Sequence, residues 1–296
     1  MAADARSLAT PLPRAPSLFR ETMSKLIASR TAVGGMVIIL AFVLGGVAAP
    51  LVAPYDPVAQ VIAERLTPPA TAGHLLGTDD LGRDIMSRII YGARISLVIG
   101  IVSVGISLAF GLLIGTAAGY FGGWFDRIVM RIIDIMLAFP YILLTIVIVA
   151  LLGPSLVNAM VAIGISQVPQ YARVVRASVM AEKENDYVSA ERSLGASHLE
   201  LMLGTILPNC IAPVFVQVTL GIGDAILSSA ALSFLGLGAQ PPTPEWGLMI
   251  ASSKEYLTTA WWVVTFPGIA ILLAVLGFNL VGDTLRDALD PRLKDQ

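Results

Sequence analysis

The sequence predicts an all-α polytopic membrane protein with about six transmembrane helices. Hydrophobic residues make up 56% of its 296 residues and charged residues only 14%, against roughly 25% charged residues in a typical soluble domain. About six stretches carry few charges and are long enough to cross a hydrocarbon core ~30 Å thick, which takes about 20 helical residues. The 27 glycines fit helices that pack closely through small residues.

The first expected span covers residues 32–54 and follows a polar N-terminus. A signal peptide has an apolar region of only about 7–15 residues, so we interpret this run as a retained span. Pro140 should kink the third expected span, because its ring removes a helical hydrogen bond. The five later spans are expected at 96–120, 128–152, 156–175, 211–236 and 260–281.

The distribution of positive charge predicts the orientation in the membrane. Most of the 19 Lys and Arg residues lie in the N-terminus, the second and fourth loops and the C-terminus. Because basic residues favour the cytoplasmic side, we expect both termini to be cytoplasmic. The expected organisation is a cytoplasmic segment 1–31, the span 32–54, an extracytoplasmic segment 55–95 with an interfacial helix, a core domain 96–282 with five transmembrane helices and a cytosolic loop 176–209, and a cytoplasmic tail 283–296.

Several kinds of chemistry are not indicated. A net charge of −2 gives no basic surface for nucleic acid, and Cys210 is alone and cannot form an intramolecular disulfide. The sequence has no Gly-Lys dipeptide and therefore no phosphate-binding loop of the Walker A type. His74 and His198 are expected on opposite sides of the membrane, as surface groups and not as metal ligands. We therefore expect no enzyme activity and no cofactor or metal on this chain.

The cytosolic loop 182–209 is predicted to form two short, rigidly connected helices. The first, 186–194, is amphipathic and ends at Gly195, which suits a left-handed cap. Ser197 and Glu200 form a capping-box pattern that opens the second, and Pro208 is expected to close it. A loop built this way can transmit force between the membrane and a partner.

This loop resembles the coupling loop of bacterial ABC-importer permeases, whose pattern is Glu-Ala-Ala, three residues, Gly and a downstream Leu-Pro. The resemblance implies that the loop contacts a cytosolic ATPase; the alternative is a helical hairpin without a partner. Two positions depart from the pattern, since a Ser and a Glu stand in place of the family's Glu and second Ala. The residues concerned are Ser189, Ala190, Glu191, Gly195, Leu207 and Pro208.

The outer segment carries a second motif, made of turn-forming and charged residues. Thr78 or Asp79 could cap a short helix, and the following residues 85–90 place apolar side chains on one face with Arg88 off it. Such a stretch is expected to rest in the membrane interface. The motif residues are Gly77, Thr78, Asp79, Leu81, Gly82, Arg83 and Asp84.

This motif is similar to a signature of the dipeptide/oligopeptide/nickel subclass of these permeases, and residues 232–247 look like its second signature. With the ending 279–292, the resemblance covers nearly the whole chain from about residue 20. It implies the type I ABC-importer permease fold and the second of two paired permeases, in a bacterial inner membrane. We expect the outer motif to hold the first span to the rest of the protein in preference to contacting cargo.

The resemblance also implies the partners: a homologous second permease, two cytosolic ABC ATPases that use ATP and Mg, and an extracytoplasmic solute-binding protein. The cargo stays open among dipeptides, oligopeptides, glutathione, nickel chelates and opine-like conjugates. An ion-gradient-driven secondary transporter is the first alternative, but no repeat of the kind common in such transporters is visible. A membrane-embedded enzyme is the second, and it would need clustered catalytic or metal-binding groups.

Polar residues inside the expected spans are candidates for the transport path. Asp134 lies one helical turn after Arg131, so we expect a structural ion pair between them. Asp224 has no such neighbour and lies ~20 Å into its span at 1.5 Å per residue, so it should face a water-filled path or the partner permease. Gln167 and Gln170 flank Pro169; helix packing is the favoured role, with Gln167 kept as a path candidate.

Overall fold

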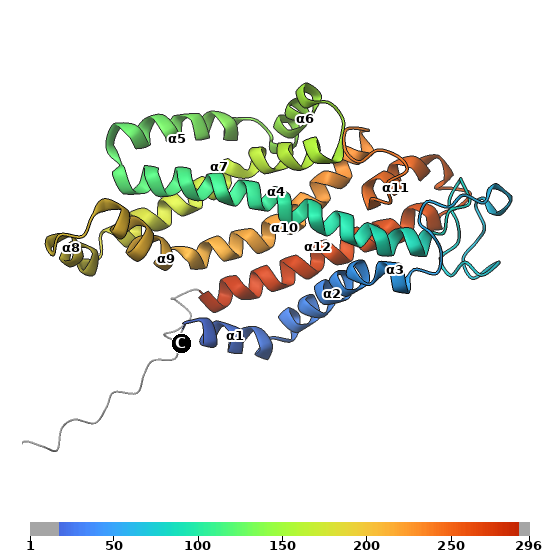
Figure 1. The fold of residues 1–296 in the computed structure, drawn as a ribbon, viewed down its shortest axis with the longest axis horizontal. Helices are drawn as coiled ribbons and strands as arrows, with labels where there is room; N and C mark the ends of the chain where they lie inside the picture. The colour runs from blue at the N-terminus through green and yellow to red at the C-terminus, as the bar shows by residue number, and fades with distance from the viewer. Residues whose placement is uncertain (1–17, 290–296) are drawn as a thin grey trace, which may run out of the picture.

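The computed structural model describes residues 18–289, and this part of the chain is helical with no β-strand. Long helices run side by side, with α8, α9, α1 and the end of α12 at one end (Figure 1). The loop that precedes α4 and the short helix α11 lie at the opposite end (Figure 1). The expected cytoplasmic segment 1–31 and the expected tail 283–296 both lie partly outside the described residues.

Most helical elements follow one another closely, and the longest connections precede α4 and α11. They are α1 Leu18–Ala28, α2 Arg30–Val47, α3 Ala49–Val52, η1 Ile62–Glu64, α4 Ile85–Phe121, α5 Gly123–Ala138, α6 Tyr141–Leu152, α7 Leu156–Lys183, α8 Asp186–Ser193, η2 Glu200–Ile206, α9 Leu207–Asn209, α10 Ile211–Phe234, α11 Trp246–Ser253, η3 Lys254–Tyr256 and α12 Trp262–Leu289.

The long helices agree with the predicted all-α membrane fold. Within residues 18–289, four helices (α2, α4, α10 and α12) are long and apolar enough to span a membrane, and α5 with α6 makes a fifth if the pair counts as one span. The remaining predicted span is α7, which has 28 residues but a more polar sequence. Its glutamines and arginines explain why α7 is less apolar than the other spanning candidates.

The expected kink at Pro140 is a full break. Helices α5 and α6 meet at an angle of 94°, and Phe139 between them has extended backbone. The residue before a proline is driven away from the helical region, and the proline itself lacks an N–H, which together favour the end of α5 at Ala138 and a new start of α6 at Tyr141. The third predicted span is therefore two helices with different directions.

Three helices extend beyond their expected ends. The expected interfacial helix is the first part of α4, which starts at Ile85 because Asp84 caps it, accepting a hydrogen bond from the Ser87 N–H at 2.7 Å. Ile85 and Arg88 are fully buried in the protein, so this stretch does not lie on a lipid interface. Helix α7 continues to Lys183, which shortens the expected loop 176–209, and α12 continues through part of the expected tail to Leu289.

The closest helix packing joins α4 to α7. Three glycines spaced four residues apart, Gly111, Gly115 and Gly119, let the backbones approach: a Cβ at Gly115 would lie 2.6 Å from the Ala172 carbonyl oxygen and 2.7 Å from the Val175 Cβ. Serines on α4 donate hydrogen bonds to α7 carbonyl oxygens, from Ser103 to Met160 at 3.1 Å and from Ser107 to Gly164 at 2.7 Å. Small residues and such hydrogen bonds are how helices associate in lipid, where burial of apolar surface gives no net drive.

We predict that Gly115→Leu disrupts this seam, whereas Gly105→Leu on the same helix does not. The Gly105 Cβ position has no atom within 4 Å, while overpacking a tight site costs about 1–3 kcal/mol or more. Thermal unfolding of the purified protein should show a clear loss for Gly115→Leu and a small change for Gly105→Leu. Equal melting temperatures for the two variants would contradict the assignment.

Candidate functional site

The loop between α7 and α10 has the predicted rigid construction. Helix α8 ends before Gly195, whose φ of +93° is the left-handed conformation that glycine adopts without strain. The capping box is present: the Glu200 carboxylate accepts from the Ser197 N–H at 2.7 Å, and the Ser197 hydroxyl accepts from the Glu200 N–H at 3.3 Å. The Glu200 carboxylate is hydrogen-bonded to the Ser197 backbone N–H and to the Ser197 side chain, and these bonds lower the pKa of Glu200.

Pro208 does not close the second helix of this loop, contrary to expectation. It lies in the first turn of α9, where a missing N–H leaves no helical hydrogen bond unmade, and the chain runs on through Cys210 into α10. The preceding segment, η2, is a π-helix. The loop is therefore connected to α10 without a flexible linker.

The loop presents most of its motif residues to solvent. Ser189, Ala190, Gly195 and Pro208 are exposed and Leu207 is half-buried, while the half-buried Glu191 accepts a hydrogen bond from the Thr205 hydroxyl at 2.6 Å. Large apolar side chains on the same loop are also exposed, among them Leu194 at 88%. The others are Tyr187, Leu199 and Leu203. An apolar surface on a rigid loop is typical of a docking site.

The inner face of the loop is attached to the membrane helices. Val188 and Leu201 are fully buried and belong to the same apolar cluster as Val175 of α7. His198, expected as a surface group, is exposed but hydrogen-bonded at its Nδ1 to the Tyr120 hydroxyl at the end of α4, at 2.7 Å. Lys183 donates to the Tyr120 carbonyl oxygen at 3.0 Å. Movement of the loop would therefore pull on both α4 and α7.

The outer motif is a packed turn in front of α4, in line with its expected structural role. Gly77 and Gly82 have φ values of +81° and +71°, and a Cβ at Gly82 would overlap the Val61 carbonyl oxygen. The Asp79 carboxylate accepts from the N–H groups of Leu81 at 2.9 Å and Arg83 at 3.0 Å, and from the Arg83 Nε at 2.7 Å. The residue that caps the helix is Asp84, and not Thr78 or Asp79.

The turn is tied to distant parts of the chain. The buried Thr78 hydroxyl donates to the Glu64 carbonyl oxygen, and the Thr78 carbonyl accepts from the Trp262 indole N–H at 3.2 Å. The second signature packs beside it: Trp246 is fully buried and donates to the Ile89 carbonyl oxygen at 3.0 Å. These contacts join the two outer signatures to the start of α4 and to α12.

His74 is buried, which corrects the expectation of a surface group. It is only 4% exposed, and its Nδ1 lies 2.8 Å from Asp84 Oδ1 while its Nε2 lies 3.2 Å from Glu64 Oε2. Burial alone would lower the pKa of His74, but the hydrogen bonds to Asp84 and Glu64, with their charges, outweigh it and raise the pKa above its ordinary value. His74 therefore connects the cap of α4 to the outer loop.

The polar candidates within the spans lie in two different settings. Asp134 pairs with Arg173 of α7, at 2.7 Å, and not with Arg131 as expected. The guanidinium group of Arg173 reaches the carboxylate from the neighbouring helix. A second pair of this kind joins Asp126 to Arg176. Asp224 is exposed on α10 and has no hydrogen bond or ion pair within the described residues.

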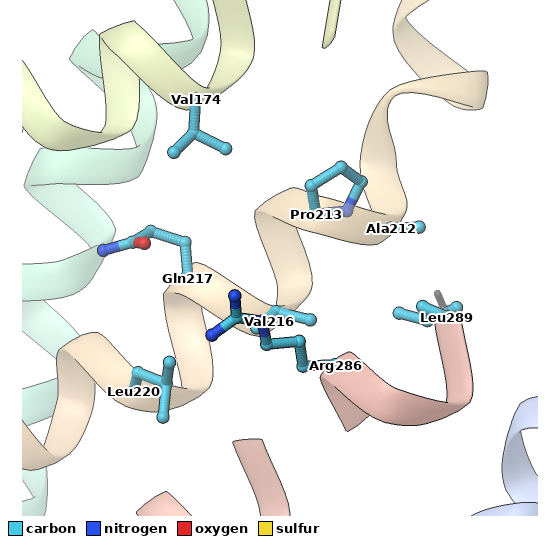
Figure 2. Close-up of a pocket in the computed structure, with 8 residues that line it drawn as sticks. All are labelled: Val174, Ala212, Pro213, Val216, Gln217, Leu220, Arg286 and Leu289. Atoms are coloured by element: carbon cyan, nitrogen blue, oxygen red, sulfur yellow. The ribbon is translucent and has the colours of Figure 1, made fainter. Parts of the chain in front are cut away.

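Three cavities lie in succession along one face of α10, and we call this face with its cavities the α10 groove. At the end near α8, a cavity of about 480 Å³ lies between α7, α10 and α12. Figure 2 shows Arg286 reaching from α12 across this cavity towards Val216 and Gln217 of α10. Further along, a cavity of about 250 Å³ contains Asp224, and a third of about 300 Å³ begins at Leu227, which also lines the second.

The groove brings the two path candidates together. Gln167 of α7 and Asp224 of α10 line the same cavity, along with Gln170, Leu227, Ser228 and Tyr141 of α6. Gln167 is 3% exposed, in agreement with packing, and Gln170 is exposed. Sequence reasoning missed Tyr141 and Arg286. The approach of Tyr141 to Ser228, one helical turn after Asp224, depends on the break before α6.

The comparisons with known proteins agree with this geometry. Residues 111–295 match the binding-protein-dependent transport system inner membrane component family, and residues 17–69 match the N-terminal TM domain of oligopeptide transport permease C. The chain belongs to this permease family. The matched residues 111–295 include the loop between α7 and α10 and the whole of α10.

Curated relatives of the family cover nearly the full chain. The chain is 52% identical over 285 residues to the di/tripeptide transport system permease protein DppC of Pseudomonas aeruginosa, covering 95% of this chain and 94% of that protein. It is 49% identical over 292 residues to the dipeptide transport system permease protein DppC of Escherichia coli K12, covering 97% of each. The predicted resemblance to the peptide subclass of ABC-importer permeases is confirmed.

A solved structure supports the predicted fold. The MetNI methionine ABC transporter in an inward-facing conformation matches 70% of this chain and 98% of its own chain, with a TM-score of 0.57 and 19% sequence identity. At this identity the likeness concerns the fold alone. The type I ABC-importer permease fold is thereby confirmed.

We predict that His74 stabilises the outer turn in a pH-dependent manner. Because its folded-state pKa is raised, the stabilisation is complete below the unfolded-state pKa and is lost as the pH rises through the folded-state pKa. The loss of melting temperature caused by His74→Gln should therefore be larger near pH ~5.5 than near pH ~8.5, on either side of the usual histidine range. A loss of the same size at both pH values would contradict this role.

Proposed function

We propose that this chain is the permease subunit of an ATP-driven importer of dipeptides, tripeptides or related small solutes. With a homologous second permease it encloses the transport path, and a binding protein delivers the cargo from outside. The observation that carries the proposal is the rigid, exposed loop of α8 and η2 on a chain whose near-full-length relatives are di- and tripeptide permeases. The relatives support the class of cargo, and the structure supports the surfaces on which the partners would bind.

The ATPase contact is supported by the exposed apolar side chains of the loop. Tyr187, Leu194 and Leu203 would otherwise be exposed to water at one end of a membrane protein. Because the chain has no Walker A loop, ATP and Mg would be bound and used by two separate cytosolic ATPases. The departures at Ser189 and Glu191 leave the apolar surface intact: Ser189 is exposed, and Glu191 is held by Thr205 inside the loop.

The second permease is supported by the open side of the α10 groove. Asp224 is exposed there and has no hydrogen-bond or ion-pair partner among residues 18–289, and a charge facing lipid near mid-membrane costs about 2.5–3.5 kcal/mol. Helix α5, which packs against α4 and α7, also exposes large apolar residues, including Trp124 and Ile132. A homologous subunit that covers both would remove the carboxylate from lipid and close the path.

Coupling follows from the contacts between the loop and the membrane helices. An ATPase that moves α8 would move Val188 against Val175 of α7, and His198 would carry the motion to Tyr120 of α4. Helix α10 continues from the loop and would shift with it. ATP binding and release would thereby change the width of the groove, which gives inward and outward alternation.

The charge pattern and the helix arrangement support a bacterial inner-membrane location with both termini in the cytoplasm. The ends of the described chain lie at the same end of the molecule as α8 (Figure 1). The outer turn and α11 would then face the binding protein. No structural observation favours the ion-gradient alternative.

We predict that uptake of alanyl-alanine by the reconstituted complex requires ATP and survives collapse of ion gradients. Ala190→Trp should lower this uptake about tenfold or more while membrane insertion stays normal, because a docking contact worth ~1.4 kcal/mol corresponds to a factor of ten. Ala190 is exposed on α8, so the larger side chain meets no atom of this chain's core.

The matched control is Ala190→Ser, which changes the same exposed position without adding a large side chain. It should transport normally. Uptake that follows an ion gradient without ATP would refute the proposed function, and normal uptake by Ala190→Trp at equal abundance would refute the loop as the site of ATPase contact.

A further inference from the structure

The α10 groove contains a cavity whose polar groups are arranged to accept hydrogen bonds. Its six lining residues come from α6, α7 and α10 and enclose about 250 Å³: Tyr141, Gln167, Gln170, Asp224, Leu227 and Ser228. A cavity of this size admits a small charged group with its water. The directions of its hydrogen bonds indicate which kind of group fits.

The Gln167 amide and the Tyr141 hydroxyl on the cavity wall already donate hydrogen bonds within the wall. The Gln167 amide nitrogen donates to the Tyr141 hydroxyl at 3.4 Å, and that hydroxyl donates to the Ser228 hydroxyl oxygen at 2.6 Å. This chain of bonds leaves the Gln167 carbonyl oxygen as an acceptor, and that atom is buried without any hydrogen-bond partner in the part of the chain described here. Gln167 itself is only 3% exposed.

The one formal charge on the wall is negative. Asp224 has no ion pair or hydrogen bond within residues 18–289, and the two nearby arginines of α7, Arg173 and Arg176, are engaged by Asp134 and Asp126. A buried acceptor left empty costs about 1–3 kcal/mol. The unpaired Asp224 carboxylate lines the same cavity and further favours a positively charged donor.

We propose that this cavity is a recognition site for a protonated amine, and that the amine is the α-ammonium group of the peptide in transit. An ammonium group has three donors and no acceptor, which matches the Asp224 carboxylate and the Gln167 carbonyl oxygen. This inference rests on the proposed function and adds to it a residue-level basis for preferring cargo with a free amino terminus. A basic side chain of the second permease could supply the same chemistry, and the test separates the two sources.

The test uses a cysteine at Leu227, which is 53% exposed and lines the cavity. The native Cys210 is buried and can stay in place. In the purified complex of permeases and ATPases, without binding protein, Leu227→Cys is treated with a cationic and with an anionic methanethiosulfonate reagent. We expect the cationic reagent to react about tenfold faster, since clefts lined by one sign of charge raise the local counter-ion concentration by such factors. Asp224→Asn should abolish the preference, and Asp283→Asn, on the exposed part of α12, should not.

A second measurement identifies the cargo amine. Millimolar alanyl-alanine should slow the labelling of Leu227→Cys, and N-acetyl-alanyl-alanine, which lacks the ammonium group, should not. The inference is overturned if Leu227→Cys is unreactive in the complex but reactive in the isolated chain, because the second permease then fills the site. It is also overturned if the charge preference does not depend on Asp224, or if both peptides protect equally. ATP-driven uptake is measured separately, so a complex that transports but fails these tests refutes only the amine site.

Discussion

The close packing of α4 against α7 is the constraint on which the other features depend. Glycines at 111, 115 and 119 bring the two backbones together, and serine-to-carbonyl hydrogen bonds from Ser103 and Ser107 fix their register. With one face of α7 held in this way, its other face directs Gln167 and Val174 towards α10. The groove beside α10 therefore exists because α7 cannot rotate or slide on α4.

Helix α4 also connects the two ends of the molecule. Its start is capped by Asp84, which is held by His74 inside the outer turn, and its last residues meet the coupling loop through Tyr120 and His198. A helix of 37 residues is ~55 Å long at 1.5 Å per residue, enough to cross the whole membrane. If an ATPase binds this loop as proposed, its displacement would reach the outer signatures through one rigid element, with the groove in between.

The sequence predicted the features that depend on local pattern and missed those that depend on tertiary contacts. Apolar runs located the helices, and the left-handed Gly195 and the Ser197–Glu200 capping box follow from nearest neighbours. The pairing of Asp134 with Arg173 joins residues on two helices, and the burial of His74 depends on Glu64 and Asp84 folding around it. The amine-accepting cavity required the break after Phe139, because only that break brings Tyr141 onto Ser228. None of these contacts has a signature at fixed spacing.

The central claim is that the groove between α7 and α10 is the transport path. It is tested most directly by a cryo-EM structure of the complete complex in lipid, with the two ATPases bound. We expect the face of α10 from Pro213 to Leu227 to border an aqueous cavity that the second permease closes, with α8 seated on an ATPase. Acyl chains packed along this face, with the path lined by other helices, would contradict the account.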